Sequence, residues 1–465
     1  MTPPAVTADV LVVGAGPAGL VAAWRAAAAG RSVVVVERAD VVGGMAGSFE
    51  VAGQQVDFGS HRLHPSTPPV ILDALRTLLG DDLQVRPRNG RIRLTGRWVR
   101  FPLRTGDLAR RLPRGFAVRA ALDAITGPLR RPRADTFAEV VRAGLGPTVA
   151  EEFYRPYIRK IWGVDPAELS GELARRRVSA ASPTDIVRRL VRGASPAGRT
   201  FLYPRRGFGQ IAESLTDAAV AAGAELRLGV DVTALKLGSD SCTLQLADGT
   251  TIDAARVWST APLGALAAAV DPPPPAPVLA GAARLAHRAL VLVYLVLERS
   301  CYTPFDAHYF PAERVAAARL SEPRNYRDGP DPPGRTVLCA EVPCSVGDAT
   351  WSADPEELGA RVAADLEAEG LPATAHVAVE IRRLPRVYPV YRPTTAWDLS
   401  ALELWAATQA RLLTFGRQGL FVPDNTHHVL AMGWAAADAL GRDGTFDHAA
   451  WAGALDRFRS FVVED

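Results

Sequence analysis

Hydrophobic positions in the first 37 residues fall into blocks that predict a strand, a helix and a second strand. The apolar run from Val10 to Val13 is rich in β-branched residues, as is typical of a buried parallel strand. An alanine-rich stretch predicts a helix to about Ala29, which Gly30 ends. A second apolar run, Val33–Val36, predicts another strand that leads into Glu37. Two parallel strands joined by a helix indicate an α/β domain.

Later blocks predict two more structural units. The alternation in RIRLTGRWVRFPL predicts a hairpin that turns at Thr95-Gly96. Apolar runs at 285–298 and 336–343 predict strands of a second sheet, with a helix at about 354–369. We therefore expect an α/β protein with a Rossmann-like domain assembled from discontinuous segments. The expected boundaries are 1–85, 203–265 and 405–465 for the nucleotide-binding domain, 86–202 for a helical cap region, and 266–404 for a mixed-sheet substrate domain.

The glycines after the first strand carry the earliest chemical signal. Gly14, Gly16 and Gly19 have the G-x-G-x-x-G spacing. The first allows a tight turn, the second lets a pyrophosphate approach the backbone, and the third lets the helix pack on the strand. The helix N-terminus offers unpaired N–H groups to phosphates, and Glu37 stands where a carboxylate accepts hydrogen bonds from a ribose. This arrangement predicts dinucleotide binding.

The charge and the cysteines of the chain bear on its possible partners and on disulfide bonds. The formal net charge of +3 does not favour nucleic acid. Arginines are dense and acids few in 86–133, which could contact anionic lipid or a phosphorylated partner. The segment lacks a clean amphipathic stripe, so we favour a solvated face. The four cysteines form no C-x-x-C pair and are expected to be reduced, and we expect no metal site.

No targeting segment is evident. The first residues, MTPPAVTAD, lack a basic region followed by an apolar one, and the longest internal apolar run, Ala289 to Leu297, is too short to span a bilayer. We expect a cytoplasmic protein without a transmembrane segment.

Several motifs together resemble a known flavoenzyme group. The motifs are G-A-G-P-A-G-L at 14–20, the pair Gly43-Gly44, T-A-P at 260–262 and G-R-Q-G-L-F at 416–421. They resemble those of FAD enzymes of the amine oxidase and protoporphyrinogen oxidase group, and most of all those of UDP-galactopyranose mutase. The resemblance implies a GR2-type FAD-binding fold. It also implies noncovalent FAD, since no cysteine follows Cys344 to form a cysteinyl link.

The resemblance also implies which residues bind FAD. Two positions depart from the family: Met45 replaces an arginine of many relatives, and Asn425 replaces an acidic residue of the mutases. The implied FAD-binding residues are Gly14, Gly16, Pro17, Ala18, Gly19, Glu37, Arg38, Gly43, Gly44, Met45, Gly59, Ser60, His61, Val232, Thr260, Gly416, Arg417, Asn425 and Thr426.

Candidate catalytic and substrate-binding residues come from several further segments. The run Gly59-Ser60-His61-Arg62-Leu63-His64 resembles the mutase loop G-P-H-x-x-H, whose first histidine lies against the flavin. Arg62 instead matches the relatives known as protoporphyrinogen oxidases. The implied catalytic residues are His61, His64 and Arg288. The implied substrate-binding residues are Tyr157, Lys160, Trp162, Arg177, Arg288 and Tyr388.

Three functions remain open. The leading hypothesis is an FAD-dependent oxidoreductase that takes hydride from a small molecule onto flavin N5. The second is a redox-neutral, flavin-dependent mutase of a nucleotide sugar, and arginines with tyrosines in one site would suit a diphosphate-containing substrate. The third is a binding protein without flavin that resembles Rab GDP-dissociation inhibitors. Neither the substrate nor the oligomeric state follows from the sequence.

Overall fold

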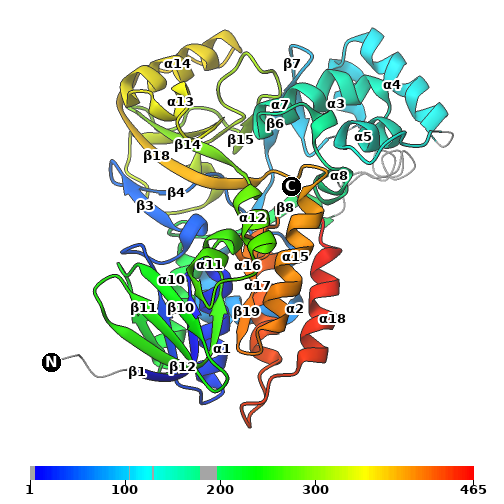
Figure 1. Ribbon diagram of the computed structural model, residues 1–465. Coiled ribbons are helices and arrows are strands. Elements are labelled where there is room, and N and C mark those ends of the chain that lie inside the picture. Colours follow the sequence, from blue (N-terminus) through cyan, green and yellow to red (C-terminus); the bar gives the residue numbers. More distant parts are fainter. Residues whose placement is uncertain (1–5, 104, 128–129, 179–195, 465) are drawn as a thin grey trace.

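Two β-sheets, each covered by helices, form the lower and upper halves of the computed structural model (Figure 1). The structure describes residues 6–103, 105–127, 130–178 and 196–464. Part of the segment 179–202, which we expected to be helical, therefore lies outside the described residues.

The lower sheet has eight strands in the order β13-β10-β11-β12-β1-β2-β9, and β19 extends it beside β12. β1 pairs in parallel with both β2 and β12, as the opening sequence pattern predicts for a buried parallel strand. The strands are β1 (Val6–Val13), β2 (Val33–Val36), β9 (Glu225–Arg227), β10 (Val232–Leu237), β11 (Cys242–Leu246), β12 (Thr251–Ser259), β13 (Val270–Asp271) and β19 (Leu412–Thr414).

Side chains alternate across β1, so that both of its faces are buried. Val10 and Val12 point into one apolar core, and Leu11 and Val13 face the other. The first core is covered by α1 (Pro17–Ala28), α2 (Pro69–Leu79), α10 (Gln210–Ala221), α17 (Thr426–Asp438) and α18 (His448–Arg459). The second is covered by α11 (Leu263–Ala269), α12 (Ala276–Arg284) and α15 (Thr395–Thr408).

The upper sheet has seven strands in the order β18-β14-β17-β16-β15-β6-β7. α14 (Pro355–Ala368) packs on one face of the long strand β14, and the hairpin of β3 (Ser48–Val51) and β4 (Gln54–Asp57) packs on the other. The strands are β6 (Gly90–Leu94), β7 (Arg97–Phe101), β14 (His287–Leu297), β15 (Ala307–Tyr309), β16 (Arg319–Ser321), β17 (Thr336–Cys344) and β18 (His376–Pro389); α13 (Ala349–Ser352) precedes α14.

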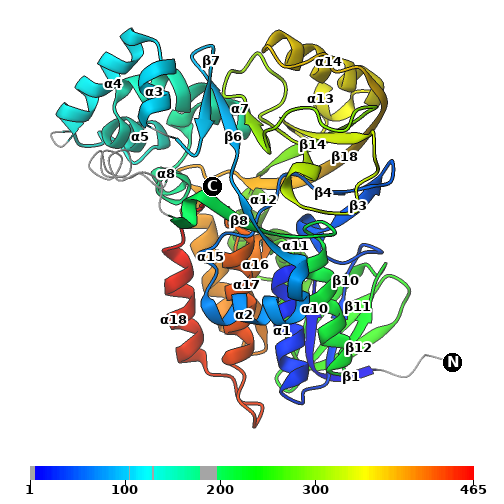
Figure 2. The same cartoon turned by 180° about the vertical axis from the view of Figure 1, so that it is seen from behind.

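The predicted hairpin at Thr95-Gly96 is confirmed, and both turn residues have positive φ. β6 pairs with β15, so this hairpin, which falls inside the range expected for the helical cap, belongs to the upper sheet. Its short-range alternation identified a hairpin but could not identify the strand it would join. Figure 2 shows the chain rising from α2 beside the lower sheet to β6 and β7 in the upper half.

A helical lobe lies beside the upper sheet at the top of the molecule (Figure 1). Its own apolar core includes Phe137, Trp162 and Leu173 and extends to Tyr391 and Phe421. The lobe contains α3 (Thr105–Arg111), α4 (Arg114–Thr126), α5 (Phe137–Leu145), α6 (Pro147–Val149), α7 (Arg155–Trp162) and α8 (Gly171–Arg177). Near the junction of the halves, β5 (Leu83–Pro87) pairs with β8 (Thr200–Pro204).

None of the described helices combines the length and the apolar character that crossing a bilayer would require.

Candidate functional site

The turn between β1 and α1 leaves no room for side chains at two of its glycines. Gly14 has φ +105°, and a Cβ there would lie 2.2 Å from Thr260 Oγ1. A Cβ on Gly19 would lie 2.0 Å from the Gly14 carbonyl oxygen. Thr260 is held against this turn because its hydroxyl donates to the Val13 carbonyl at 3.0 Å. Both glycines therefore do what the sequence pattern predicts: one turns the chain tightly and one lets α1 pack on β1.

The middle glycine faces open space. A Cβ on Gly16 would meet no atom within 4 Å on that side, while Gly44 lies close by, with Gly16 Cα 3.7 Å from the Cβ position of Gly44. Gly16 caps α1 without a side-chain hydrogen bond, so the first N–H groups of the helix point to this space without a capping side chain. Such a helix start suits an anion.

Glu37 lies at the edge of the same turn. Its carboxylate accepts hydrogen bonds from the N–H groups of Ala15 at 2.8 Å and Ala39 at 3.0 Å. The Val230 N–H donates to the Glu37 carbonyl at 2.9 Å, two residues before Val232 begins β10. The neighbouring Arg38 is exposed.

A third segment closes on the first. A Cβ on Gly416 would be 3.2 Å from Ala18 Cβ. The Arg417 guanidinium donates to the carbonyls of Asp424 and Val387, each at 2.7 Å. Gln418 Nε2 lies 3.9 Å from Met45 Sδ. Residues 14–45 and 416–418 thus meet, as the family resemblance implied.

The start of α17 follows this segment. Thr426 is the first residue of α17, and Asn425 caps it. The Asn425 amide also donates to the Glu464 carbonyl at 3.0 Å and accepts from the Glu464 N–H at 2.8 Å. The side chain of Asn425 is therefore already paired, and the N–H groups of the helix start are what it leaves to a ligand.

Burial shifts the ionisation of two groups beside α17. It lowers the pKa of Arg417 to about 10, with a further contribution from Arg177. It raises the pKa of Asp424 to about 7, although Arg176 and Arg417 oppose the shift. Arg417 and Arg176 thus lie near a carboxyl whose ionisation burial opposes.

The segment Gly59 to His61 lies between the two halves. The Ser60 N–H donates to Glu341 Oε1 at 2.8 Å, which ties the segment to β17 of the upper sheet. His61 stacks on Phe208, with ring centroids 5.3 Å apart. Burial lowers the pKa of His61 to about 4; Asp57 opposes the shift, and Arg319 and Arg417 reinforce it. Among the described residues, His61 Nδ1 has no hydrogen-bond partner. His61 is thus neutral at neutral pH.

Two buried ion pairs beneath this segment were missed by sequence reasoning. Arg319 forms two hydrogen bonds with Glu341, both 2.8 Å long. Arg62 pairs with Asp306 at 3.1 Å; although burial alone would lower the pKa of Arg62, attraction to Asp306 raises it overall. Arg62 and Asp306 lie far apart in sequence, whereas Arg319 and Glu341 face each other on the neighbouring strands β16 and β17; no local motif relates either pair.

His64 belongs to a different cluster from His61. It lies with His427 and Glu464, and one donor atom from each lies within 4.8 Å of the others, close enough to share a metal ion. His64 Nδ1, however, accepts from the Ser66 N–H at 3.1 Å, and Glu464 Oε2 lies 3.2 Å from this atom and 3.3 Å from His427 Nε2. The three side chains therefore form a group linked by hydrogen bonds and ion contacts. This group holds His64 against the start of α17.

The predicted substrate residues divide into two sets. Trp162 lies beside Tyr388, with ring centroids 5.8 Å apart, and Arg177 lies over the Trp162 ring at 5.5 Å. Arg288 packs on the adjacent Gly163, where a Cβ would be 2.7 Å from its Cζ.

The other set, Tyr157 and Lys160, is held by other residues. Lys160 Nζ donates to the carbonyls of Phe310 and Ala317, at 2.5 and 3.1 Å, and burial lowers its pKa to about 7. Tyr157 stacks on Phe153. Since two backbone carbonyls already occupy the Lys160 ammonium, its contact with substrate stays a prediction.

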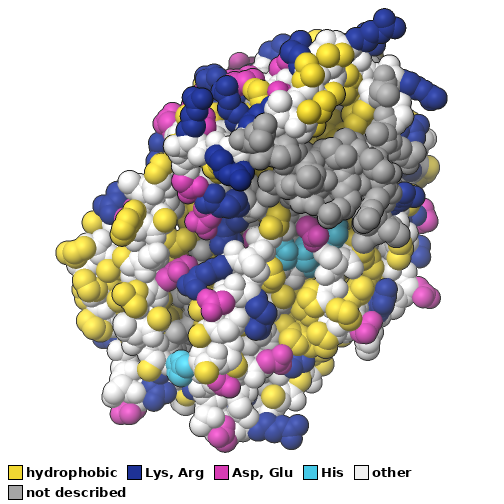
Figure 3. All heavy atoms as spheres, turned by 90° about the vertical axis from the view of Figure 1, so that its right-hand side faces the viewer, with side chains coloured by type: hydrophobic (Ala, Val, Ile, Leu, Met, Phe, Trp, Pro, Cys, Tyr) yellow, Lys and Arg dark blue, Asp and Glu magenta, His cyan; other side chains and the backbone are white. Residues whose placement is uncertain are grey.

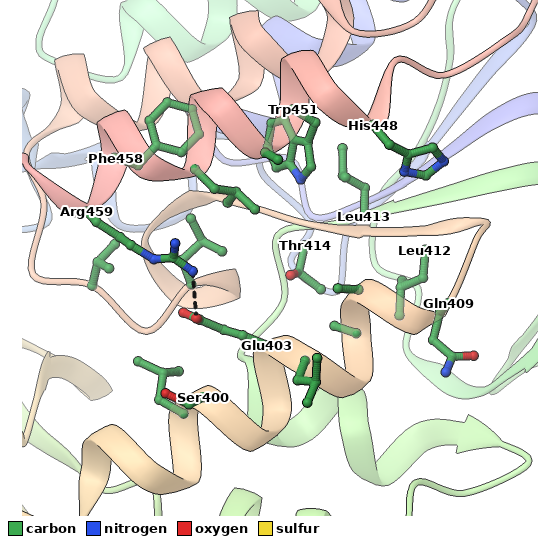
Figure 4. A pocket seen from close by; sticks show the side chains of 18 of the residues that line it. Ser400, Glu403, Gln409, Leu412, Leu413, Thr414, His448, Trp451, Phe458 and Arg459 are labelled. Atoms are coloured by element: carbon green, nitrogen blue, oxygen red, sulfur yellow. Dashed lines mark hydrogen bonds and ion pairs between the residues drawn. The ribbon is translucent and has the colours of Figure 1, made fainter.

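A separate pocket of about 730 Å³ lies on the outer side of the lower half, between α15, β19 and α18. Trp451 and Phe458 line it on one side and the α15 residues on the other, and an Arg459–Glu403 ion pair of 3.3 Å crosses it (Figure 4). None of the residues predicted from the sequence lines this pocket, so it is distinct from the candidate site.

The described residues around Gly16 fit a dinucleotide. They offer an uncapped helix start, an open approach to the backbone, and a carboxylate at the end of β2. Further along, the buried atoms His61 Nδ1 and Arg417 Nε have no partner among the described residues, which is the pattern expected where a polar ligand is to bind.

Comparisons with known proteins agree with this geometry. The family model described as "Flavin containing amine oxidoreductase" matches residues 17–412. The chain is 30% identical to phytoene dehydrogenase of Streptomyces griseus over 277 residues (51% of this chain and 51% of that protein) and 43% identical to putrescine oxidase of Kocuria rosea over 86 residues (18% of each). The matches thus span about half or less of these relatives' length.

A crystal structure of reduced UDP-galactopyranose mutase is similar over 98% of this chain and all of that chain, with a TM-score of 0.81 and 21% sequence identity. At this identity the likeness concerns the fold alone. It confirms the expected architecture, with a Rossmann-like flavin-binding domain and a substrate domain.

Proposed function

The chain belongs to the family of flavin-containing amine oxidoreductases, and from this premise we propose that it is an oxidoreductase that binds FAD noncovalently and oxidises a small molecule. The observation that carries the proposal is the meeting of three remote segments, at Gly14–Gly19, Thr260 and Gly416, around the open side of Gly16. Bound FAD would supply the hydride acceptor.

The residues of the chain have distinct tasks in this proposal. The N–H groups at the start of α1 bind the pyrophosphate, and Glu37 binds the ribose. The start of α17 stabilises negative charge on the flavin ring. The upper sheet holds the Gly59–His61 segment in place, because the Ser60 N–H donates to Glu341 of β17. Neutral His61 offers Nδ1 to the reacting groups as a hydrogen-bond partner.

We further propose that the substrate carries an anionic group. Three guanidinium groups, those of Arg177, Arg319 and Arg417, act electrostatically on Tyr388, whose ring lies beside Trp162. Glu341, the partner of Arg319, offsets one of them, which leaves a net positive charge from Arg177 and Arg417. Such a site repels an ammonium ion and attracts carboxylate or phosphate, which guanidinium groups bind through two hydrogen bonds. A diphosphate-containing molecule therefore fits this proposal better than a simple amine.

Two measurements test the proposal. Purified protein should show the visible absorbance of a flavin, and denaturation should release it as FAD. Anaerobic addition of candidate anionic substrates should then bleach that absorbance. Colourless protein that cannot be reconstituted with FAD would sink the proposal and favour a binding protein without flavin.

A redox-neutral mutase acting on a nucleotide sugar is the second candidate, and the grouping of Trp162, Arg177 and Tyr388 favours it. The same anaerobic experiment separates the two. A mutase turns over only after dithionite has reduced the flavin, and its substrate does not bleach the oxidised enzyme.

A further inference from the structure

The helical lobe exposes an apolar stripe on α4, within the segment 86–133 whose sequence pattern showed no clean amphipathic stripe. The stripe consists of Val118, Ala121, Leu122 and Ile125, all exposed, with Val118 59%, Leu122 58% and Ile125 74% accessible. At about 3.6 residues per turn this spacing puts all four on one side of the helix. Isolated exposed apolar residues are ordinary, but a stripe along one helix face marks an interaction surface.

The opposite side of α4 holds the helix in the lobe. Phe116 is buried there, and Asp123 Oδ2 accepts from the Thr148 N–H at 2.8 Å. Asp123 Oδ1 also pairs with Arg130 at 3.1 Å. The side chains that anchor α4 thus point away from the stripe, and its exposure is a consequence of how the helix is docked.

Positive charge surrounds the stripe. Residues 105–133 contain seven arginines and two aspartates. Both aspartates are already paired, Asp107 with Arg111 and Asp123 with Arg130. Arg119 pairs with Glu152, outside this segment. Within the described part of the chain, the exposed Arg110, Arg114 and Arg131 form no ion pair. After these three pairs, four of the seven arginines remain as surplus positive charge.

We propose that the α4 stripe docks this protein on membranes that contain anionic lipid. The apolar side chains enter the boundary between headgroups and acyl chains, and the surrounding arginines bind lipid phosphates. Charge argues for this occupant over a second copy of the chain, because two such surfaces would repel each other. The combination of an apolar stripe with arginine argues against an acidic macromolecule, which would use the charges alone.

The position of α4 suits this role. It lies at the outer top corner of the molecule, away from the lower half (Figure 1). Figure 3 shows hydrophobic side chains (yellow) at the top of the molecule with dark blue arginine or lysine side chains beside them. Docking there leaves the flavin-binding half free of the membrane surface.

Vesicle sedimentation of the full-length, flavin-loaded protein tests the proposal. Vesicles of phosphatidylcholine mixed with phosphatidylglycerol should bind the protein, and vesicles of phosphatidylcholine alone should bind it much less. About 0.5 M salt should release most of the bound protein, because it shortens the range of charge attraction. Failure to bind the mixed vesicles at low salt would overturn the proposal.

Variants separate the contributions. The double variant Leu122→Ser/Ile125→Ser should bind the mixed vesicles about tenfold more weakly, since it removes two inserted side chains. Arg110→Gln/Arg114→Gln should weaken binding by a similar factor of about ten. The control Val220→Ser, which changes a 52% exposed valine on α10, should bind as the parent does. All variants should keep their flavin.

Two results identify other occupants and contradict the proposal. If Leu122→Ser/Ile125→Ser binds mixed vesicles as tightly as the parent, charge alone acts and the surface suits any polyanion. If the double variant instead abolishes a dimer seen by light scattering, the stripe is an interface between copies.

Discussion

The flavin-binding half and the substrate half are built by different means. Around Gly14 and Gly19 the lower half relies on packing so close that a Cβ would lie about 2 Å from its neighbour, Thr260 Oγ1 in one case and the Gly14 carbonyl oxygen in the other. Around Arg319 and Glu341 the upper half relies on buried charges from separate strands. The lower half therefore tolerates no side chain at Gly14 or Gly19, and the upper half tolerates no lost partner.

Gly14→Val should have the largest effect. Its Cβ would collide with Thr260 Oγ1 at 2.2 Å and occupy a backbone conformation with φ +105°. We expect purified protein without flavin absorbance. Gly249→Ala is the control: its φ is +84°, but a Cβ there meets nothing within 4 Å, so flavin content should be retained with a stability loss of about 1 kcal/mol. Equal flavin loss in both variants would show that the positive φ of Gly14, and not the collision with Thr260, prevents flavin binding.

Glu341→Ala should lower the free energy of unfolding by about 3–5 kcal/mol, because it leaves Arg319 buried without its partner. It also removes the acceptor for the Ser60 N–H. Denaturant titration gives the measurement. Asp73→Ala, which breaks an exposed pair with Arg76, should change stability by no more than about 0.5 kcal/mol. A loss below about 1 kcal/mol at Glu341 would contradict the importance of this pair.

His61→Ala should slow substrate-dependent flavin reduction by about a hundredfold or more while flavin content stays near that of the parent. The reason is that its ring stacks on Phe208 beside the proposed reaction site and contributes no part of the turn at Gly14. Stopped-flow absorbance measures the rate, and the spectrum of the purified variant measures occupancy. An unchanged rate would remove His61 from the chemistry.

The smallest expected effect is a loss of folding stability at acidic pH. Burial lowers the pKa of His308 to about 3. The unfolded chain takes up a proton near pH 6.5 and the folded protein does not, so stability is full above pH 6.5 and falls as pH drops toward 3. At pH 5 this single group costs about 2 kcal/mol relative to pH 7. His308→Gln should therefore flatten the dependence of unfolding free energy on pH between 7 and 5, and an unchanged slope would contradict it.

Sequence reasoning succeeded where the physical cause is local. The Gly14–Gly19 turn, the Thr95-Gly96 hairpin and β14 follow from residues close together in the chain. It could not see that β6 pairs with β15, or that Ser60 bonds Glu341, because those contacts join segments more than 200 residues apart. The motif predicts that Lys160 faces substrate; it could not show that its ammonium is bonded to Phe310 and Ala317 of the upper half, and the contact with substrate stays a prediction.

The close fit of α17 on α1 has a consequence for synthesis. A Cβ on Gly433 would lie 2.1 Å from the Ala18 carbonyl oxygen, so the two helices touch through backbone. A growing chain therefore makes α1 early but cannot cover it until residues 426–438 have left the ribosome. Until then one apolar side of the first helix stays uncovered, and shortened chains that stop before residue 426 should aggregate rather than fold as independent nucleotide-binding fragments.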